Sequence, residues 1–211
     1  AITGISQATG RSITFSGAGG VLSFDLNQFN DLAVGESETL AFAYTVDDQE
    51  GQVNSTNIST VTITVQGRND QPLAADASQT TNEDAGTFTL DANTLVSDVD
   101  ATDVLSITGI SQATGRSITF SDASGVLSFD TSQFNDLAVG ESETLTFEYT
   151  VDDQEGQGNS TNMATLTVTV EGRNDQPTAA DDSQTTNEDA GTFTLDANTL
   201  ASDVDATDVL S

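Results

Sequence analysis

The sequence predicts an all-β protein made of tandem β-sandwich domains. Three observations support this fold class: the chain repeats itself at a shift of 105 residues, its apolar residues alternate with polar ones over short segments, and turns rich in Gly, Asn and Asp separate those segments. No segment has the period and length of a long amphipathic helix.

The repeat sets the domain organisation. The two copies are about 85% identical, and Asn69 aligns with Asn174. A unit of this length suits a whole domain. The motif GRNDQP, at 67–72 and 172–177, combines Gly, Asn-Asp and Pro after a strand and is typical of a linker. We therefore expect residues 1–70 to be the C-terminal two-thirds of a repeat lacking its first strands, 71–176 a complete repeat, and 177–211 the N-terminal third of a further repeat.

The clearest predicted strands are 39–47 and 60–67. In both, large apolar residues occupy alternate positions, which is the pattern of a strand with one buried face; they are Leu40, Phe42, Tyr44 and Val46 in the first, and Val61, Ile63 and Val65 in the second. Ala43 becomes Glu148 in the second copy, which fits a solvent-facing position. Shorter strands are expected at SITFS, GVLSFD and GTFTLD. About seven strands per repeat favour an immunoglobulin-like sandwich, with a barrel as the alternative.

Composition excludes several function classes. The chain has 34 Asp and Glu, four cations that are all arginines, and no His, Cys or Trp, giving a formal net charge of -30. No basic face for nucleic acid or an anionic membrane can form, and no apolar run is long enough to span a bilayer. Triads, thiolate nucleophiles and zinc sites of the usual ligands are also absent. We expect no enzyme activity, since the acids that a carboxylate-only glycosidase would need lie here on exposed turns.

The acids gather in four groups per repeat, mostly at predicted strand ends. Because Ca²⁺ takes six to eight oxygen ligands in flexible geometry, these groups are candidate calcium sites; solvated turns are the alternative. The candidate ligands are Asn69 and Asp70 with Asn174 and Asp175 in the linkers, Glu83 and Asp84 with Glu188 and Asp189 in NEDAG, Asp98, Asp100 and Asp103 with Asp203, Asp205 and Asp208 in SDVDATD, and Asp152 and Asp153 in VDDQEG.

Strand direction predicts which groups meet. If the first strand of a repeat runs away from its linker, NEDAG lies beside the next linker and SDVDATD returns to the preceding one. One site would then combine Glu83 and Asp84 with 174–175 and 203–208. The other would combine 69–70 with 98–103 and with Asp152 or Asp153.

Two stretches carry a resemblance to a known family. ESETLAFAYTVDDQEG, followed by STVTITVQGRNDQP, resembles the VCBS and cadherin-like tandem repeats of bacterial RTX-type adhesins, and NEDAGTFTLDANTLVSDVDATDVLSITGI looks like the start of the same unit. The resemblance implies extracellular extender repeats, stiffened by calcium at their junctions, that hold a distal adhesive domain away from the bacterial surface after type I secretion. The upstream linker lacks the extra acid often found before Asn-Asp in cadherin linkers.

Other readings stay open at this stage. The repeats could themselves bind a carbohydrate, although aromatic residues are few, or the acids could serve only to hold water and salt. The expected partners are neighbouring repeats of the same chain. A second possible partner is another molecule, because 177–211 carries the strands that 1–70 lacks and could donate them head to tail.

Overall fold

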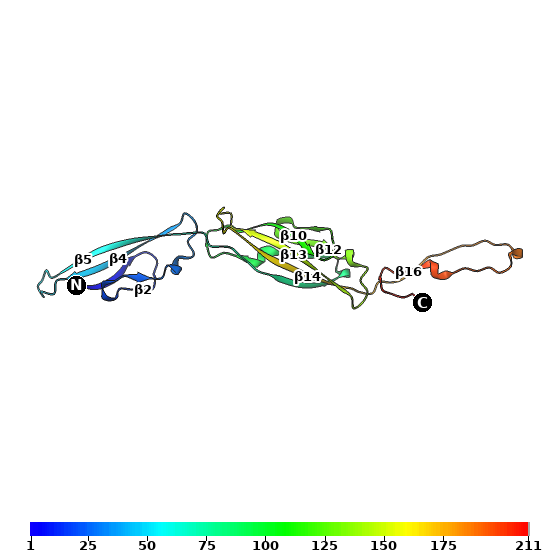
Figure 1. Cartoon of the computed structure of the whole chain (residues 1–211), viewed down its shortest axis with the longest axis horizontal. Coiled ribbons are helices and arrows are strands. Elements are labelled where there is room, and N and C mark those ends of the chain that lie inside the picture. Colours follow the sequence, from blue (N-terminus) through cyan, green and yellow to red (C-terminus); the bar gives the residue numbers. More distant parts are fainter. Residues whose placement is uncertain (211) are drawn as a thin grey trace. The chain divides into compact units, whose positions relative to one another are not determined.

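A computed structural model describes residues 1–210 as strands joined by turns and short 3-10 helices, with no α-helix in that range. The chain forms two compact units, each assembled from separate segments (Figure 1). Unit 1 comprises Ala1–Ala74, Val96–Ser106 and Val151–Asn162. Unit 2 comprises Ala75–Leu95, Ile107–Thr150 and Met163–Ser211. None of the described helices is long and apolar enough to cross a membrane.

Unit 1 is built on a three-stranded antiparallel sheet in the order β1-β4-β5, with β1 at Ile2–Thr9, β4 at Ser37–Asp47 and β5 at Thr56–Gln66. Two short pairs accompany it: β2 (Phe15–Ser16) with β3 (Ser23–Phe24), and β6 (Leu73–Ala74) with β9 (Val96–Ser97). The core forms around Phe29, Leu32, Leu40 and Phe42. Phe15 and Phe24 pack on Phe42, with ring centroids 5.1 and 5.9 Å away.

Unit 2 contains most of a larger sandwich. One sheet has the order β10-β13-β14-β7, with β10 at Ser106–Thr114, β13 at Ser142–Asp152, β14 at Thr161–Glu171 and β7 at Ala77–Asn82; β7 runs parallel to β14. The other sheet has the order β11-β12-β8, with β11 at Phe120–Ser121, β12 at Val126–Asp130 and β8 at Thr87–Asp91. Phe129 of β12 stacks on Phe147 of β13, so the two sheets face each other across a shared core. A final short pair joins β15 (Thr178–Ala179) to β16 (Ala201–Ser202).

Short 3-10 helices occupy several turns and are capped by side chains. Asp25 and Asp130, for example, accept the backbone N–H two residues later, as Asx turns do. The helices are η1 (Ala18–Gly20), η2 (Leu26–Phe29), η3 (Glu83–Ala85), η4 (Ala92–Leu95), η5 (Ala123–Gly125), η6 (Thr131–Phe134), η7 (Glu188–Ala190) and η8 (Ala197–Leu200).

One half-buried arginine in each copy holds a loop to the sheet. Arg116 donates to Asp136 at 2.6 Å, forms an ion pair with Glu143, and lies over the Phe134 ring at 4.9 Å. Arg11 repeats this arrangement with Asp31, Glu38 and Phe29. Two of the four arginines therefore have a structural role that the composition alone did not suggest.

The predicted all-β, immunoglobulin-like fold is confirmed. The alternation in 39–47 holds, since Leu40 and Phe42 are buried and Glu148 is exposed. The strand predicted at 60–67 begins earlier, at Thr56. Sequence reasoning missed β1 and β10, because register shifts after Ile2 and after Gln7 break the alternation of β1. The proposed domain boundaries at 70 and 176 stay a prediction.

Candidate cation sites

The motif SDVDATD folds into a compact turn that brings three carboxylates together. Asp98 accepts the backbone N–H of Asp100 at 3.0 Å, and the N–H of Asp103 donates to the Asp100 carbonyl at 3.2 Å. As a result, each of the three side chains offers an oxygen within 4.8 Å of the other two. Asp203, Asp205 and Asp208 form the same arrangement in the next copy. Alternating acids on a tight turn thus converge on a small volume.

The first linker is bound to this turn. The backbone N–H of Asp70 donates to Asp100 at 2.7 Å, and the Asn69 amide donates to Asp153 at 2.9 Å. Asn159 in turn donates to the Asn69 carbonyl at 2.7 Å. We call Asn69, Asp70, Asp98, Asp100, Asp103 and Asp153 the first cation cluster; all six lie in unit 1.

Many oxygens of the first cation cluster are buried without a hydrogen-bond donor. They are Asn69 Oδ1, Asp98 Oδ2, Asp100 Oδ1 and Asp103 Oδ2. Asp100 is 3% exposed and Asp153 is 1% exposed. Burial raises the pKa of Asp103 to about 6, and the nearby Asp100 and Glu155 carboxylates add to the shift. Burial also raises the pKa of Asp100. Buried, mutually repelling carboxylates of this kind call for a positive charge.

Unit 2 contains a second cluster with a different composition. The backbone N–H of Asp175 donates to Asp205 at 3.0 Å, and the backbone N–H of Arg173 donates to Glu83. Glu83, Asp175 and Asp205 each place a carboxylate oxygen within 4.8 Å of the other two. We call these three, with Asp84, Asn174, Asp203 and Asp208, the second cation cluster.

The second cation cluster has the same electrostatic character. Glu83 is 1% exposed, and Glu83 Oε2, Asp175 Oδ2 and Asp205 Oδ1 are buried without a donor. Burial raises the pKa of Glu83, and Asp175 and Asp205 contribute further. The pKa of Asp175 is also raised, by burial and then by Asp205 and Asp84. Asn174 is exposed, unlike its half-buried counterpart Asn69.

The glycine of each linker is required by close backbone approach. A Cβ on Gly172 would lie 2.3 Å from the carbonyl oxygens of Leu137 and Ala138, and one on Gly67 would meet Leu32 and Ala33 in the same way. The N–H of Gly172 donates to the Glu141 carbonyl at 3.0 Å. Each linker is therefore seated against the 32–36 or 137–141 loop of the repeat that precedes it.

Other candidate residues lie differently. Asp152 accepts the N–H of Gln154 at 2.7 Å and caps its own turn. Glu188 and Asp189 are exposed on η7, and no cluster forms around them within residues 1–210.

Glu155 and Asn135 were not among the candidate ligands, but they are linked to the acidic clusters. The Glu155 carboxylate helps to raise the pKa of Asp103. Its position in the same acidic turn as Asp153 could have identified it from the sequence. Asn135 Oδ1 is buried without a donor, beside Asp136, whose carbonyl accepts the N–H of Ala206. No sequence signal marked Asn135.

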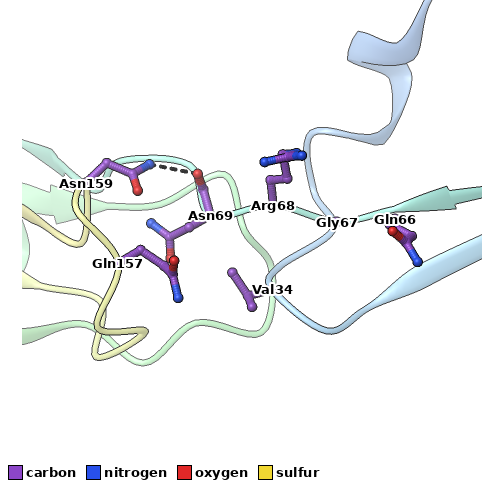
Figure 2. Close-up of a pocket in the computed structure, with 7 residues that line it drawn as sticks. All are labelled: Val34, Gln66, Gly67, Arg68, Asn69, Gln157 and Asn159. Atoms are coloured by element: carbon purple, nitrogen blue, oxygen red, sulfur yellow. Dashed lines mark hydrogen bonds between the residues drawn. The ribbon is translucent and has the colours of Figure 1, made fainter.

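A surface pocket of unit 1 lies against the first linker. Figure 2 shows the Asn159 amide directed at the Asn69 carbonyl, and the lining has no aromatic ring and no acid: it consists of Val34, Gln66, Gly67, Arg68, Asn69, Gln157 and Asn159. Pockets for small organic ligands usually have a mainly apolar and aromatic lining. The acidic clusters are therefore the better candidate sites.

The donor set fits a hard cation. Every side-chain ligand atom on offer in both clusters is a carboxylate or amide oxygen. In each cluster three carboxylates place an oxygen within 4.8 Å of one another, and several of the buried oxygens have no hydrogen-bond donor. Ca²⁺ accepts such ligands in irregular number and geometry, whereas Mg²⁺ requires a stricter octahedron and retains its waters. Metals that prefer imidazole or thiolate find neither ligand in this chain.

Two family models match parts of the chain. Residues 69–170 match the bacterial Ig domain, and residues 3–94 match the Spy0128-like isopeptide containing domain. Both support immunoglobulin-like bacterial repeats. An isopeptide bond joins a side-chain amine to a side-chain carbonyl group, and this chain has no lysine to supply the amine. Such a crosslink is therefore not available here.

Comparison with solved structures gives distant similarities. An endo-fucoidan hydrolase from glycoside hydrolase family 107 matches at 13% identity and TM-score 0.30, over 80% of this chain and 23% of that one. Zebrafish RET cadherin-like domains 1 to 4 match at 14% identity and TM-score 0.27, over 80% of this chain and 41% of that one. This chain thus spans less than half of either structure. No curated protein matches.

Proposed function

We propose that this chain is a stretch of structural repeats from a bacterial surface adhesin, and that calcium stiffens the repeats at their junctions. The repeats would act as an extender that holds a distal binding domain away from the cell. In this proposal the carboxylates hold cations and have no catalytic role.

One observation carries the proposal: buried, unpartnered oxygens are concentrated in the two linker clusters. Of the eight such side-chain atoms among the described residues, seven belong to the two clusters, and only Asn135 Oδ1 does not. A buried polar atom without a partner is costly, and a buried like-charged group is more so. A bound divalent cation would satisfy the oxygens and cancel the repulsion.

The linker contacts support a mechanical role. At the first junction, Gly67 is seated on the preceding loop and its N–H donates to the Glu36 carbonyl at 2.9 Å. Two residues later the linker is bound to Asp100 and Asp153 of the following repeat. The Ala101 N–H also donates to the Asp31 carbonyl, at 3.4 Å. A cation among these carboxylates would hold the linker on its C-terminal side as firmly as the backbone contacts hold it on the other.

An extracellular setting supports calcium in particular. Extracellular modules commonly bind Ca²⁺ with dissociation constants of roughly 10⁻⁴–10⁻³ M, which fits millimolar calcium outside the cell. The chain has no cysteine and so no disulfide to stabilise it there. Binding to the folded state alone would add stability at each occupied site.

Isothermal titration with calcium tests the binding itself. We expect specific binding to the wild-type chain. Asp100→Asn should remove binding at the first cation cluster, and Asp205→Asn should remove binding at the second, so each variant should bind fewer calcium ions per chain. Glu148→Gln is the matched control, since it removes one charge from an exposed strand position away from both clusters. Equal binding by all three variants would show that the ions respond only to net charge, and it would refute the proposed sites.

Spin-label distances test the stiffening. The chain has no native cysteine, so Ser59→Cys and Ser117→Cys label one exposed residue on each side of the first linker. Calcium should narrow the distance distribution, and a chelator should broaden it. A distribution of unchanged width, measured where titration shows bound calcium, would leave a binding site without a mechanical role.

A further inference from the structure

The pocket beside the first linker differs in charge from the rest of the chain. It has a volume of about 540 Å³, which lies in the range of small-molecule sites. No acid lines it, although the chain has 34 Asp and Glu. Arg68 is its one charged residue, and the side-chain amides of Gln66, Gln157 and Asn159 supply further polar groups. This lining disfavours an apolar ligand and suits a hydroxylated one that carries a negative charge.

The Arg68 guanidinium has no acid partner in the described part of the chain. Arg11 and Arg116, by contrast, each form ion pairs with two acids. Arg68 is exposed, and no ion pair within residues 1–210 includes it. A guanidinium presents a planar set of N–H donors that matches a carboxylate in a bidentate arrangement. It can therefore receive a carboxylate from outside the chain.

The neighbouring amides have unused hydrogen-bonding capacity. Asn159 donates to the Asn69 carbonyl at 2.7 Å, which orients its side chain and leaves one N–H and the amide oxygen over. The Gln66 side chain forms no hydrogen bond with the described residues, and Gln157 donates only a long one, of 3.4 Å. Figure 2 shows Gln157 and Asn159 on one turn, beside the linker that carries Arg68. Such amides can donate to sugar hydroxyls and accept from them.

The second linker shows that a full preceding repeat leaves these groups open. Glu171 and Arg173 are the counterparts of Gln66 and Arg68, and they follow a copy that has β7 and β8 in place. Glu83 accepts the backbone N–H of Arg173. The side chains of Glu171 and Arg173 nevertheless stay exposed, and Arg173 forms no ion pair with the described residues. A tandem array would therefore keep Gln66 and Arg68 accessible.

We propose that this pocket binds a uronate residue of an acidic polysaccharide. The Arg68 guanidinium would pair with the carboxylate, and the amides of Gln66, Gln157 and Asn159 would hydrogen-bond to ring hydroxyls. A second copy of this chain is a poorer partner, because two molecules of net charge -30 repel each other, whereas one uronate brings a single charge. The more distant acids are screened at physiological salt, where the Debye length is about 8 Å.

The inference goes beyond the extender role, because it gives the repeats a ligand of their own. It also does not require a bound cation as a ligand to the sugar, since Arg68 and Gln66 belong to neither cation cluster. The two proposals can therefore fail separately.

One sequence difference predicts that the two linkers behave differently. Glu171 stands two residues before Arg173, where Gln66 stands before Arg68. A carboxylate at this position would compete for the guanidinium and repel a uronate. We therefore expect the first linker to bind the sugar and the second not to bind it.

Titration of the whole chain with methyl glucuronide, followed by NMR, tests the proposal. The signals to follow are the Nε–H groups of the four arginines and the side-chain amide of Asn159. The Arg68 and Asn159 signals should shift with a dissociation constant on the order of 1–10 mM, as suits one exposed charge-assisted pair and a few hydrogen bonds. The Arg173 signal should not shift. Methyl glucoside lacks the charge and acetate lacks the hydroxyls, so each should bind at least about tenfold more weakly.

Three variants at exposed positions make the test specific. Gln66→Glu copies the residue of the second linker, and Arg68→Gln removes the guanidinium, so each should weaken the shift of the Asn159 amide by at least about tenfold in affinity. Arg173→Gln removes the other unpaired arginine and should bind as the wild-type chain does. The titrations are made with calcium present and at fixed ionic strength.

Three results would overturn the proposal. The first is the absence of a saturable shift at Arg68. The second is equal affinity for acetate and glucuronide, which would reveal an adventitious anion only. The third is unchanged binding after Gln66→Glu or Arg68→Gln, which would place the ligand elsewhere. Calcium titration of the same variants reports the cation clusters, so loss of the sugar site and loss of the cation sites can be told apart.

Discussion

Two nearly identical sequences in this chain have different environments. Residues 106–171 repeat residues 1–66, yet Leu127 is fully buried while Leu22 is only half-buried. Asp153 is 1% exposed, whereas its counterpart Asp48 is exposed. The second copy has the segment 77–91 on its strand edges, and the linker 69–70 and the turn 98–103 at its acidic end. Alternation therefore sets which residues face inward, but neighbouring segments decide how far those residues are buried.

Core truncation should separate the two copies most strongly. Leu127→Ala should cost about 2–5 kcal/mol of unfolding free energy, because it empties a fully enclosed site. Leu22→Ala should cost less than about 2 kcal/mol, since its site is already partly open to water. Urea unfolding measures both. Equal costs would mean that Leu22 is as well enclosed as Leu127, which would contradict the difference in burial between the two copies.

The pH dependence of stability should reverse when calcium is added. In chelator, the melting temperature should fall as pH rises from about 4 through about 6. The reason is that Asp103, Asp100 and Glu83 have raised pKa values, so ionisation costs more in the folded state than in the unfolded state. With calcium the melting temperature should rise over the same range, since binding needs the ionised form.

The variant Asp103→Asn is the control for that reversal. In chelator, the melting temperature of this variant should change less between about pH 4 and about pH 6 than that of the wild-type chain. Asp31 and Asp136, whose pKa values are lowered by Arg11 and Arg116, lose their contribution only below about pH 4 and so lie outside this window. If the melting temperature of the wild-type chain in chelator rose over this pH range, ionisation of the clustered acids would not destabilise the folded state, and the prediction would be wrong.

A smaller difference is expected at the two tyrosines. The Tyr149 hydroxyl donates to the Ala75 carbonyl at 2.8 Å, so Tyr149→Phe should cost about 1 kcal/mol. Tyr44→Phe should cost less, because Tyr44 is only half-buried whereas Tyr149 is fully buried. Chemical denaturation of each variant measures the difference. Equal costs would contradict the difference in environment between the two copies.

The smallest effect should come from copying Glu148 into the first repeat. Ala43→Glu should change the unfolding free energy by no more than about 0.5 kcal/mol, because Glu148 is exposed on the equivalent strand. Thermal unfolding at moderate salt measures it. A large loss would mean that this face of β4 is covered by something other than solvent.

The sequence predicted the parts of this structure that follow local rules. Alternation identified β4 and β5, and the 105-residue shift identified the repeat. Strand direction predicted that Glu83 would lie near Asp175 and Asp205, where the structure places it. Whether these residues bind a metal stays a prediction.

What the sequence could not give depends on irregular backbone and long-range contacts. β1 was not predicted, because two register shifts break its alternation of apolar and polar residues. Asn135 carries no motif, and its buried oxygen is evident only once the chain is folded. The burial of Asp153 depends on residues 84 positions away in the chain, through the Asn69 amide.

The most direct test of the central claim is a thermal melt at fixed ionic strength with calcium, with magnesium and with chelator. It is made on the wild-type chain and on the variant that combines Asp100→Asn with Asp205→Asn. The account predicts a large stabilisation by calcium that magnesium does not match and that the variant loses. Coincident curves in all three conditions would show that the buried acids hold no specific cation, and the calcium-stiffened extender would be contradicted.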